Sequence, residues 1–260
     1  MNIETTLRLG VFTFVFAFMA IWEIFAPKRV QAFSKLVRFA NNLGLMVLNT
    51  IVLRLVFPIG AGGVALYCQL HSIGLFNLVK APVILEFLLS IALLDLVIYW
   101  QHVMFHKIPW FWKLHQVHHA DPEFDVSTSG RFHVFEIAIS MVIKVAAILV
   151  IGPSALAVLL FEIVLNACAM FNHSNVKMAP KIDAILRQFI VTPDMHRVHH
   201  SQIISEQNCN FGFNIPWWDR LFKTYKSQPE LGHTNMKIGL GDAISKRDLW
   251  LDKMLLRVFK

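Results

Sequence analysis

The feature that most limits how this chain can fold is a series of long apolar runs. The runs occupy residues 7–26, 43–59, 83–100, 134–151 and 155–171. A helix that crosses the hydrocarbon core of a bilayer needs about 20 predominantly apolar residues. Hydrophobic residues make up 56% of the 260 residues and charged residues only 16%, unlike a soluble domain. The sequence therefore predicts an all-α integral membrane protein with about four to six transmembrane helices.

The segment between the second and third runs leaves the number of spans open. Pro58 and the glycine-rich residues 60–63 interrupt the second run, and proline and glycine are the strongest interruptions of a helical pattern. Residues 64–79, beyond this break, fit a re-entrant piece, a short sixth span or a helix lying in the membrane interface.

The basic residues predict the orientation of the spans. The loop after the first run carries Lys28, Arg29, Lys35 and Arg38, and short basic loops mark the cytoplasmic side of a membrane. In this topology, four of the 24 Lys and Arg residues fall outside cytosolic segments, namely Arg8, Arg54, Lys80 and Lys144. The net charge of +7 then fits a membrane surface, and we predict no nucleic-acid partner because no basic motif stands in a soluble module.

Histidines form three clusters at the ends of the apolar runs. Residues 102–106 read HVMFH, residues 115–119 read HQVHH, and residues 194–200 read DMHRVHH. On a helix, residues three and four apart share a face, so each cluster presents its imidazoles in one direction. The eight box histidines are His102, His106, His115, His118, His119, His196, His199 and His200.

These eight imidazoles exceed what one ion can bind and therefore predict two metal ions. All three clusters lie on the predicted cytosolic face, where they can meet. A site built only from imidazole suits iron and dioxygen activation, although zinc also binds such ligands. A zinc hydrolase of the HExxH type is disfavoured, because Gln116 follows His115 and Arg197 follows His196.

Further residues are predicted to complete the site. His173 follows the fifth run on the same face, and His133 precedes the fourth, so both are candidate ligands. Ligand histidines usually donate their second ring N–H to a carboxylate or carbonyl. The candidates for this orienting role are Asp95, Tyr99, Asp121, Asp194 and Glu206.

The motifs HVMFH, HQVHH, FNHSN and DMHRVHH, in this order, resemble the fatty acid hydroxylase/sterol desaturase superfamily of integral-membrane di-iron enzymes. The segments RFHVFE and NFGFNIPWWDRLFKTY resemble its bacterial sterol-desaturase-like members. The resemblance implies a helical membrane domain with a cytosolic cap that carries a histidine-lined di-metal site. Some members have another histidine four residues before the one equivalent to His173. Ala169 stands there in this chain, so a ligand is either missing or supplied by His133.

The resemblance also implies a division of the chain and a reaction. Residues 1–82 would be an N-terminal membrane anchor region, residues 83–226 the hydroxylase-like catalytic domain, and residues 227–260 a basic cytosolic tail. Two iron ions and molecular oxygen would hydroxylate or desaturate a C–H bond of a lipid taken from the bilayer. The expected location is the inner (plasma) membrane of a bacterium, with the active site facing the cytosol.

Electrons for this reaction must come from another protein. The sequence has no GxGxxG opening a helix after a strand and no iron–sulfur cysteine set, so a ferredoxin, cytochrome or reductase is expected as the external donor. Two other functions remain open at this point. One is a histidine-rich membrane metal transporter or metal-binding protein without oxygenase activity, and the other is a metal-free scaffold that retains the motifs.

Overall fold

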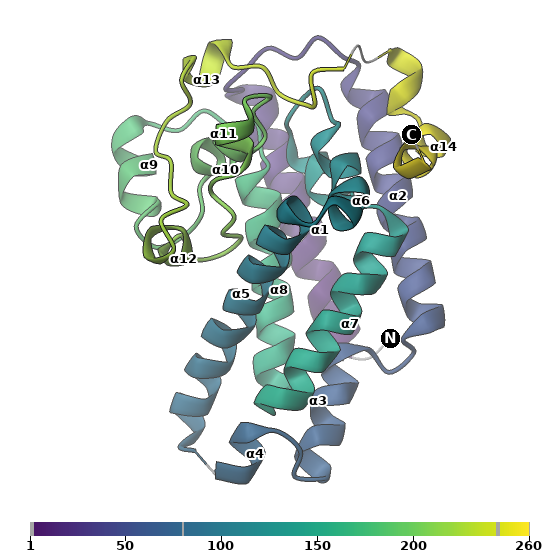
Figure 1. The fold of residues 1–260 in the computed structure, drawn as a ribbon, viewed down its shortest axis with the longest axis vertical. Coiled ribbons are helices and arrows are strands. Elements are labelled where there is room, and N and C mark those ends of the chain that lie inside the picture. Colours follow the sequence, from purple (N-terminus) through teal and green to yellow (C-terminus); the bar gives the residue numbers. More distant parts are fainter. Residues whose placement is uncertain (1–2, 80, 243–244, 260) are drawn as a thin grey trace.

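The computed structural model describes residues 3–79, 81–242 and 245–259. Long helices form a bundle, and short helices form a cap at one end of it (Figure 1). The long helices are α1 (Ile3–Phe25), α2 (Lys35–Val56), α5 (Val83–Lys107), α7 (Val134–Ile151) and α8 (Ala155–Asn172). The described residues form two isolated β-bridges but no strand, which confirms the all-α prediction.

The remaining helices are shorter. Two lie at the end of the bundle opposite the cap, α3 (Gly60–Leu70) and α4 (Leu75–Val79). The others are α6 (Pro109–His119), η1 (Val126–Gly130), α9 (Pro180–Leu186), α10 (Pro193–His199), α11 (Ile204–Gln207), α12 (Trp217–Leu221), α13 (Gly232–Asn235), η2 (Lys246–Leu249), α14 (Leu251–Leu256) and η3 (Arg257–Phe259).

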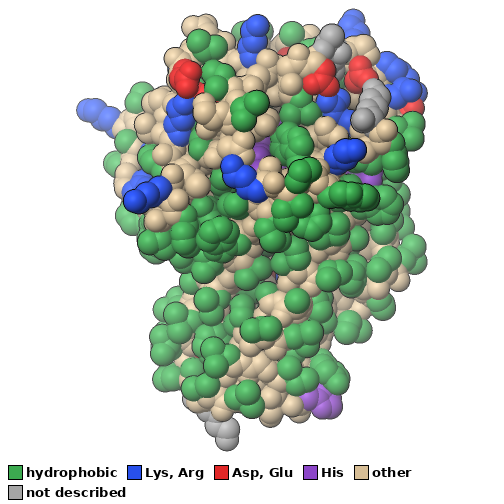
Figure 2. Space-filling model, viewed as in Figure 1, with side chains coloured by type: hydrophobic (Ala, Val, Ile, Leu, Met, Phe, Trp, Pro, Cys, Tyr) green, Lys and Arg blue, Asp and Glu red, His purple; other side chains and the backbone are tan. Residues whose placement is uncertain are grey.

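The bundle has the length and surface of a membrane domain. Five segments of the described chain are long and apolar enough to cross a bilayer: α1, the stretch Lys35–Val79, α5, α7 and α8. On the face seen in Figure 2, the surface of the bundle is hydrophobic, while charged side chains gather on the cap. Large side chains such as Phe14 and Val150 are more than 70% exposed, as lipid-facing residues would be. The predicted integral membrane fold is confirmed.

Residues 64–79 extend the second span. After the break at Pro58, α3 continues in the direction of α2 away from the cap (Figure 1). Ala61, Ala65 and Cys68 of α3 are buried in the main hydrophobic core with residues of α5, α7 and α8. This burial places α3 inside the bundle, so these residues do not add a sixth span.

Two glycines let the turns at this end of the bundle pack backbone against backbone. Gly74 has φ +91° and Gly152 has φ +67°, a region that residues with a Cβ rarely adopt. A Cβ on Gly74 would lie 2.4 Å from the backbone nitrogen of Gly152. The turn before α4 and the turn between α7 and α8 are thereby held together.

A buried ion-pair network fixes the loop that follows α6. Arg38 of α2 reaches Asp121 with two hydrogen bonds of 2.8 Å and also contacts Asp125. All three side chains are fully buried, so loss of one partner would leave an uncompensated charge. The arginine therefore couples the second span to the loop after the HQVHH box.

The last residues also pack on the bundle. Met254 of α14 and Val258 of η3 are buried in a cluster with Leu45 of α2 and with Phe105 and Leu114 of α5 and α6. The segment predicted as a basic tail thus contributes apolar side chains to the junction between bundle and cap.

Candidate metal centre

The first two histidine boxes are delivered by consecutive helices. His102 and His106 lie one turn apart at the cap end of α5. Pro109 begins α6 at its first turn, a position where the missing N–H of proline is tolerated. The resulting bend turns the HQVHH box of α6 back toward α5, and the ring centroids of His102 and His115 lie 5.0 Å apart.

The structure gathers nine histidines into two groups. Within each group, one ligand atom per residue lies within 4.8 Å of all the others. We call them group A and group B. Group A comprises His102, His106, His115, His119 and His199. Group B comprises His118, His173, His196 and His200. All are buried except His106, which is partly exposed.

The two groups are adjacent because each HxxHH box contributes to both. In α6, His115 and His119 belong to group A while His118 belongs to group B. In the third box, His199 belongs to group A, whereas His196 and His200 belong to group B. The rings of His119 and His200, from different groups, stack with centroids 4.5 Å apart.

His173 joins the centre and His133 does not. The Nε2 atom of His173 lies 3.0 Å from Nε2 of His118 and 3.1 Å from Nε2 of His196. His133 instead caps the start of α7, where its Nδ1 accepts a hydrogen bond from the backbone N–H of Phe135 at 3.2 Å. The structure therefore places the candidate tenth ligand outside both groups.

Four histidines are oriented through Nδ1. The backbone carbonyls of Phe211, Cys209 and Ala169 lie 2.7–2.8 Å from Nδ1 of His102, His199 and His173 respectively. The carboxylate of Glu136 lies 2.6 Å from Nδ1 of His115. Such contacts fix the ring and the tautomer and leave Nε2 free for a metal.

The unpartnered ring nitrogens fit a metal centre. The Nε2 atoms of His102, His115 and His199 are buried and have no hydrogen-bond partner among the described residues. A buried polar atom without a partner is costly, and a metal ion would supply that partner. Nine imidazoles in two groups provide the donor set of two nitrogen-ligated ions.

Burial also keeps the imidazoles in the form that binds metal. Removal from water lowers the pKa of His115 to about 3 and that of His173 to about 4. Burial likewise holds the pKa of His118, His119 and His200 well below the ordinary range. These rings are neutral at pH 7, as metal ligation requires.

The five predicted orienting residues bind other partners. Asp95 accepts from the indole N–H of Trp218 at 2.8 Å, and the Tyr99 hydroxyl lies 2.9 Å from that of Thr224. The acidic groups of the cap pair with basic ones: Asp121 with Arg38, Asp194 with Lys28 and Arg197, and Glu206 with Lys226. They stabilise segments around the two histidine groups. Among the described residues, none of the five is hydrogen-bonded to a histidine of either group.

Sequence reasoning missed Glu136, although a signal was present. This carboxylate stands in the first turn of the span α7, within the RFHVFE segment. An ionisable residue in such a place is usually functional. Asp219 was missed as well: it accepts the backbone N–H groups of Phe211 and Gly212 at 2.8 and 2.9 Å. Asp219 thereby positions the Phe211 carbonyl that holds His102.

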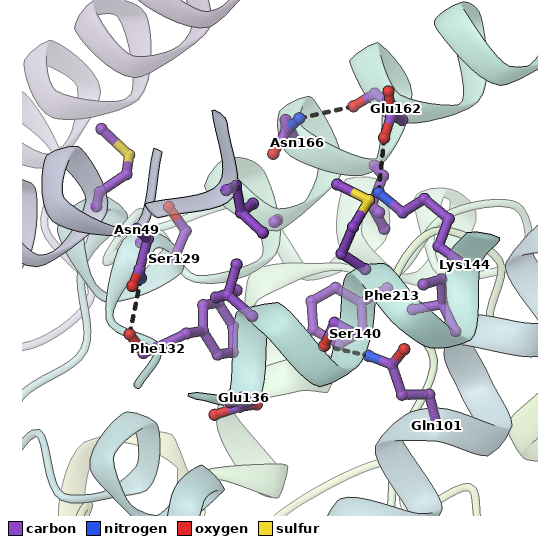
Figure 3. Close-up of a pocket in the computed structure, with 18 of the residues that line it drawn as sticks. Asn49, Gln101, Ser129, Phe132, Glu136, Ser140, Lys144, Glu162, Asn166 and Phe213 are labelled. Carbon is purple, nitrogen blue, oxygen red and sulfur yellow. Dashed lines mark hydrogen bonds and ion pairs between the residues drawn. The ribbon is translucent and has the colours of Figure 1, made fainter. Parts of the chain in front are cut away.

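A cavity of about 470 Å³ leads from the histidines into the bundle. His102, His115 and Glu136 line it near the metal centre. Farther along, α1, α2, α5, α7 and α8 contribute mostly apolar walls, and polar side chains such as Asn49 and Ser140 interrupt them (Figure 3). Its volume is in the range of small-molecule binding sites.

Residues of both α1 and α2 line one side of the cavity. The two helices meet near the cap, where the rings of Phe16 and Phe39 lie 5.7 Å apart. Farther from the cap, Arg8 of α1 and Thr50 of α2 both line the cavity. Thr50 is exposed, and the Arg8 side chain is 28% exposed. The cavity therefore reaches the lipid-facing surface between α1 and α2.

Fold and site together define a helical membrane protein with two adjacent histidine groups that could each hold a metal ion, beside a cavity that reaches the lipid-facing surface. The family model for fatty acid hydroxylase matches residues 87–224, more than half of the chain. The chain belongs to the fatty acid hydroxylase family, and the resemblance seen in its motifs is confirmed.

Curated relatives are similar over part of their length. Ornithine lipid hydroxylase OlsE of Rhizobium tropici is 26% identical over 166 residues, 64% of this chain and 48% of that protein. Alkylglycerol monooxygenase of Homo sapiens is 30% identical over 135 residues, 51% of this chain and 28% of that protein. Cholesterol 25-hydroxylase of Rattus norvegicus is 24% identical over 144 residues, 55% of this chain and 47% of that protein. The chain thus spans about half of these relatives or less. No solved structure matches it.

Proposed function

We propose that the protein is an oxygen-dependent, non-haem di-iron enzyme that hydroxylates a C–H bond of a membrane lipid. The observation that carries this proposal is the position of group A, with group B beside it, at the end of a cavity that reaches the lipid-facing surface. The names of the relatives support the reaction class, since they describe hydroxylation of an ornithine lipid or cholesterol and monooxygenation of an alkylglycerol.

In this proposal, group A and group B each hold one iron ion, and zinc would be a substitute without redox activity. Bound iron supplies the electron-transfer chemistry that activates molecular oxygen. Glu136 and the carbonyls of Phe211, Cys209 and Ala169 hold the histidine rings in position. Burial of the centre excludes water, which protects a reaction with an unactivated C–H bond.

The cavity walls would orient the substrate. Phe105, Phe132 and Phe213 line the cavity beside His102 and His115, so an apolar chain packs there with its reacting carbon near group A. Hydroxylation is favoured over desaturation, which would require removal of a second hydrogen atom from the same chain.

The electrons would come from a ferredoxin, cytochrome or reductase that docks on the cap. Basic side chains of the C-terminal segment include Lys237, Lys246, Arg247, Lys253 and Arg257, and they suit an acidic protein or anionic lipid headgroups. We place the protein in the inner (plasma) membrane of a bacterium with the cap in the cytosol, following the distribution of Lys and Arg.

A metal transporter is the less favoured alternative. A transport path would place ligands at successive depths of the spans. Both histidine groups instead lie together at the cap end of the bundle, within 4.8 Å inside each group.

The test compares lipids and metal in cells that make the wild type or a variant. We expect wild-type cells to contain a lipid that has gained one oxygen atom, detected by mass. His118→Ala should abolish this product and lower the iron content of purified protein. His71→Ala, a matched control at the exposed end of α3, should change neither. Unchanged lipids together with altered cellular metal would reject the enzyme in favour of transport.

A further inference from the structure

The end of the cavity farthest from the histidines is charged. Arg8, Lys144 and Glu162, from α1, α7 and α8, all line it. Glu162 accepts from the Lys144 ammonium at 2.7 Å and pairs with the Arg8 guanidinium at 2.8 Å. In Figure 3, Lys144 and Glu162 point toward one another across the pocket, and Asn166 lies beside them. Charged residues within spans are costly, and they usually line a cavity that carries a substrate.

These three side chains retain capacity for a ligand. The exposed fraction is only 28% for the side chain of Arg8, 15% for that of Lys144 and 12% for that of Glu162. A lysine ammonium can donate three hydrogen bonds, and the one recorded for Lys144 in the described structure goes to Glu162. Arg8 is balanced on its outer side by Glu4 at 2.9 Å, and Glu4 does not line the cavity. The part that faces the cavity is therefore one carboxylate between two cations, with a surplus of donors.

Between this charged end and the histidines, the walls are mainly apolar. Phe12, Leu53, Ile98, Met141 and Leu165 line the middle of the cavity. A ligand that matches this lining has an apolar body with a hydrogen-bond acceptor at one end. A hydrocarbon without oxygen would leave the Lys144 donors unused.

The separation of the two ends follows from helix geometry. Lys144 stands eight residues after Glu136 on α7, and Glu136 contacts the group A ligand His115. At 1.5 Å per residue, the Cα atoms of Glu136 and Lys144 are separated by about 12 Å along the helix axis.

We propose that Lys144, with Arg8 and Glu162, binds an oxygen-bearing polar group of the substrate, a hydroxyl or a carboxylate. The substrate then lies with its polar end at the charged end of the cavity and its apolar far end beside group A. This proposal rests on the proposed lipid hydroxylation. It names the substrate class as an amphiphile that is oxidised far from its polar group, since the residues that would hold its two ends are two turns or more apart on α7.

Two photoreactive probes test the orientation without turnover. Both are long-chain alcohols, one with a diazirine next to the hydroxyl and one with a diazirine near the methyl end. In the protein as purified, with no electron donor present, the first should label peptides around Lys144 and Glu162, and the second should label peptides around His102 and His115. The reverse pattern, or equal labelling by both probes, would overturn the proposal.

A variant tests the role of the charge. Lys144→Met combined with Glu162→Gln removes one charge of each sign and leaves no unpaired carboxylate. The measured quantity is how well an unlabelled long-chain alcohol, compared with the matched alkane, prevents labelling by the photoreactive probe. We expect the double variant to lower this preference for the alcohol by about tenfold, as for loss of a charge-assisted hydrogen bond. Arg54→Met is the matched control, because Arg54 lies in α2, is exposed and does not line the cavity. An unchanged preference for the alcohol in the double variant would contradict the proposal.

The outcome is separable from that of the proposed function. A probe pattern as expected, with no oxidised lipid in wild-type cells, would leave the polar subsite standing and reject the hydroxylase. Thermal unfolding of the double variant shows whether it is folded. If it does not fold, Lys144→Met alone leaves Glu162 paired with Arg8 and should weaken the preference for the alcohol over the alkane, and an unchanged preference would count against the subsite.

Discussion

At the scale of single residues, three backbone carbonyls and one carboxylate hold four of the histidine rings through Nδ1. Histidines at helical spacing leave a pattern, whereas three of the four orienting acceptors are backbone carbonyls, of Phe211, Cys209 and Ala169. A backbone carbonyl has no side-chain signature, so its position depends on how the loop folds. Asp121 and Asp194, which are close to the histidine boxes in the sequence, form ion pairs with arginines instead.

The one orienting carboxylate, Glu136, gives a prediction at this scale. Glu136→Leu removes the acceptor 2.6 Å from Nδ1 of His115 and leaves the ring free to turn. We expect metal affinity to fall by about 10- to 100-fold, as is typical for loss of such a partner. Glu136→Gln keeps an oxygen acceptor and should lose less. Competition with a chelator measures both, and equal affinities in wild type and Glu136→Leu would show that the contact has no orienting role.

At the scale of the element, the HxxHH box contributes to both histidine groups because of its helical rotation. Consecutive residues of an α-helix are turned by about 100°, so His118 and His119 face different directions, with ring planes 85° apart. The sequence predicted two ions from the number of histidines. It could not predict which histidine belongs to which group, because that depends on how α5, α8 and α10 meet α6.

This division predicts different consequences for neighbouring substitutions. His119→Ala removes a ligand of group A, and His118→Ala removes one of group B. Each should lower the metal content by about half, with the remaining ion in a different environment in the two variants. Metal analysis and the spectrum of a cobalt-substituted sample measure this. Identical spectra would mean that the two residues serve the same ion.

The apolar runs of the sequence predicted where the long helices lie, and the stretch after Pro58 is the exception. α5 continues without a break from the third run to Lys107, because no proline or glycine interrupts it before Pro109. The stretch after Pro58 was ambiguous from its sequence, since a helix of 11 residues is too short to span a bilayer. Only packing of Ala61 and Ala65 in the core decides where it lies.

At the scale of the whole molecule, the stability of the folded cap depends on pH through a buried histidine. His233 of α13 is 9% exposed, and its Nε2 atom lies 3.8 Å from Asp194 of α10. Burial lowers the pKa of His233 to about 4, although Asp194 raises it and the cations Arg197 and Lys28 lower it. The unfolded chain protonates near pH 6.5, so the folded state is disfavoured as the pH falls from 6.5 toward 4.

The corresponding prediction concerns thermal unfolding. The penalty from His233 should be absent above pH 7 and reach on the order of 2 kcal/mol near pH 4, after allowance for its partial contact with solvent. His233→Gln lacks this penalty, so the difference between its Tm and that of the wild type should shift in favour of the variant as the pH is lowered. A difference that is constant from pH 7 to pH 4.5 would contradict the buried neutral state.

The route from the bilayer into the cavity is also a property of the whole molecule, because it depends on how α1 and α2 are placed below the cap. Thr50 is exposed and lines the cavity, so Thr50→Trp would place an indole in the opening. We expect kcat/KM for a long-chain lipid to fall by about tenfold or more, since an overfilled site excludes the chain. Metal content should stay unchanged, because Thr50 contacts no histidine of either group. Ile51→Trp is the matched control, since Ile51 is 52% exposed and does not line the cavity. Equal activity of the two variants would show that the substrate enters by another path.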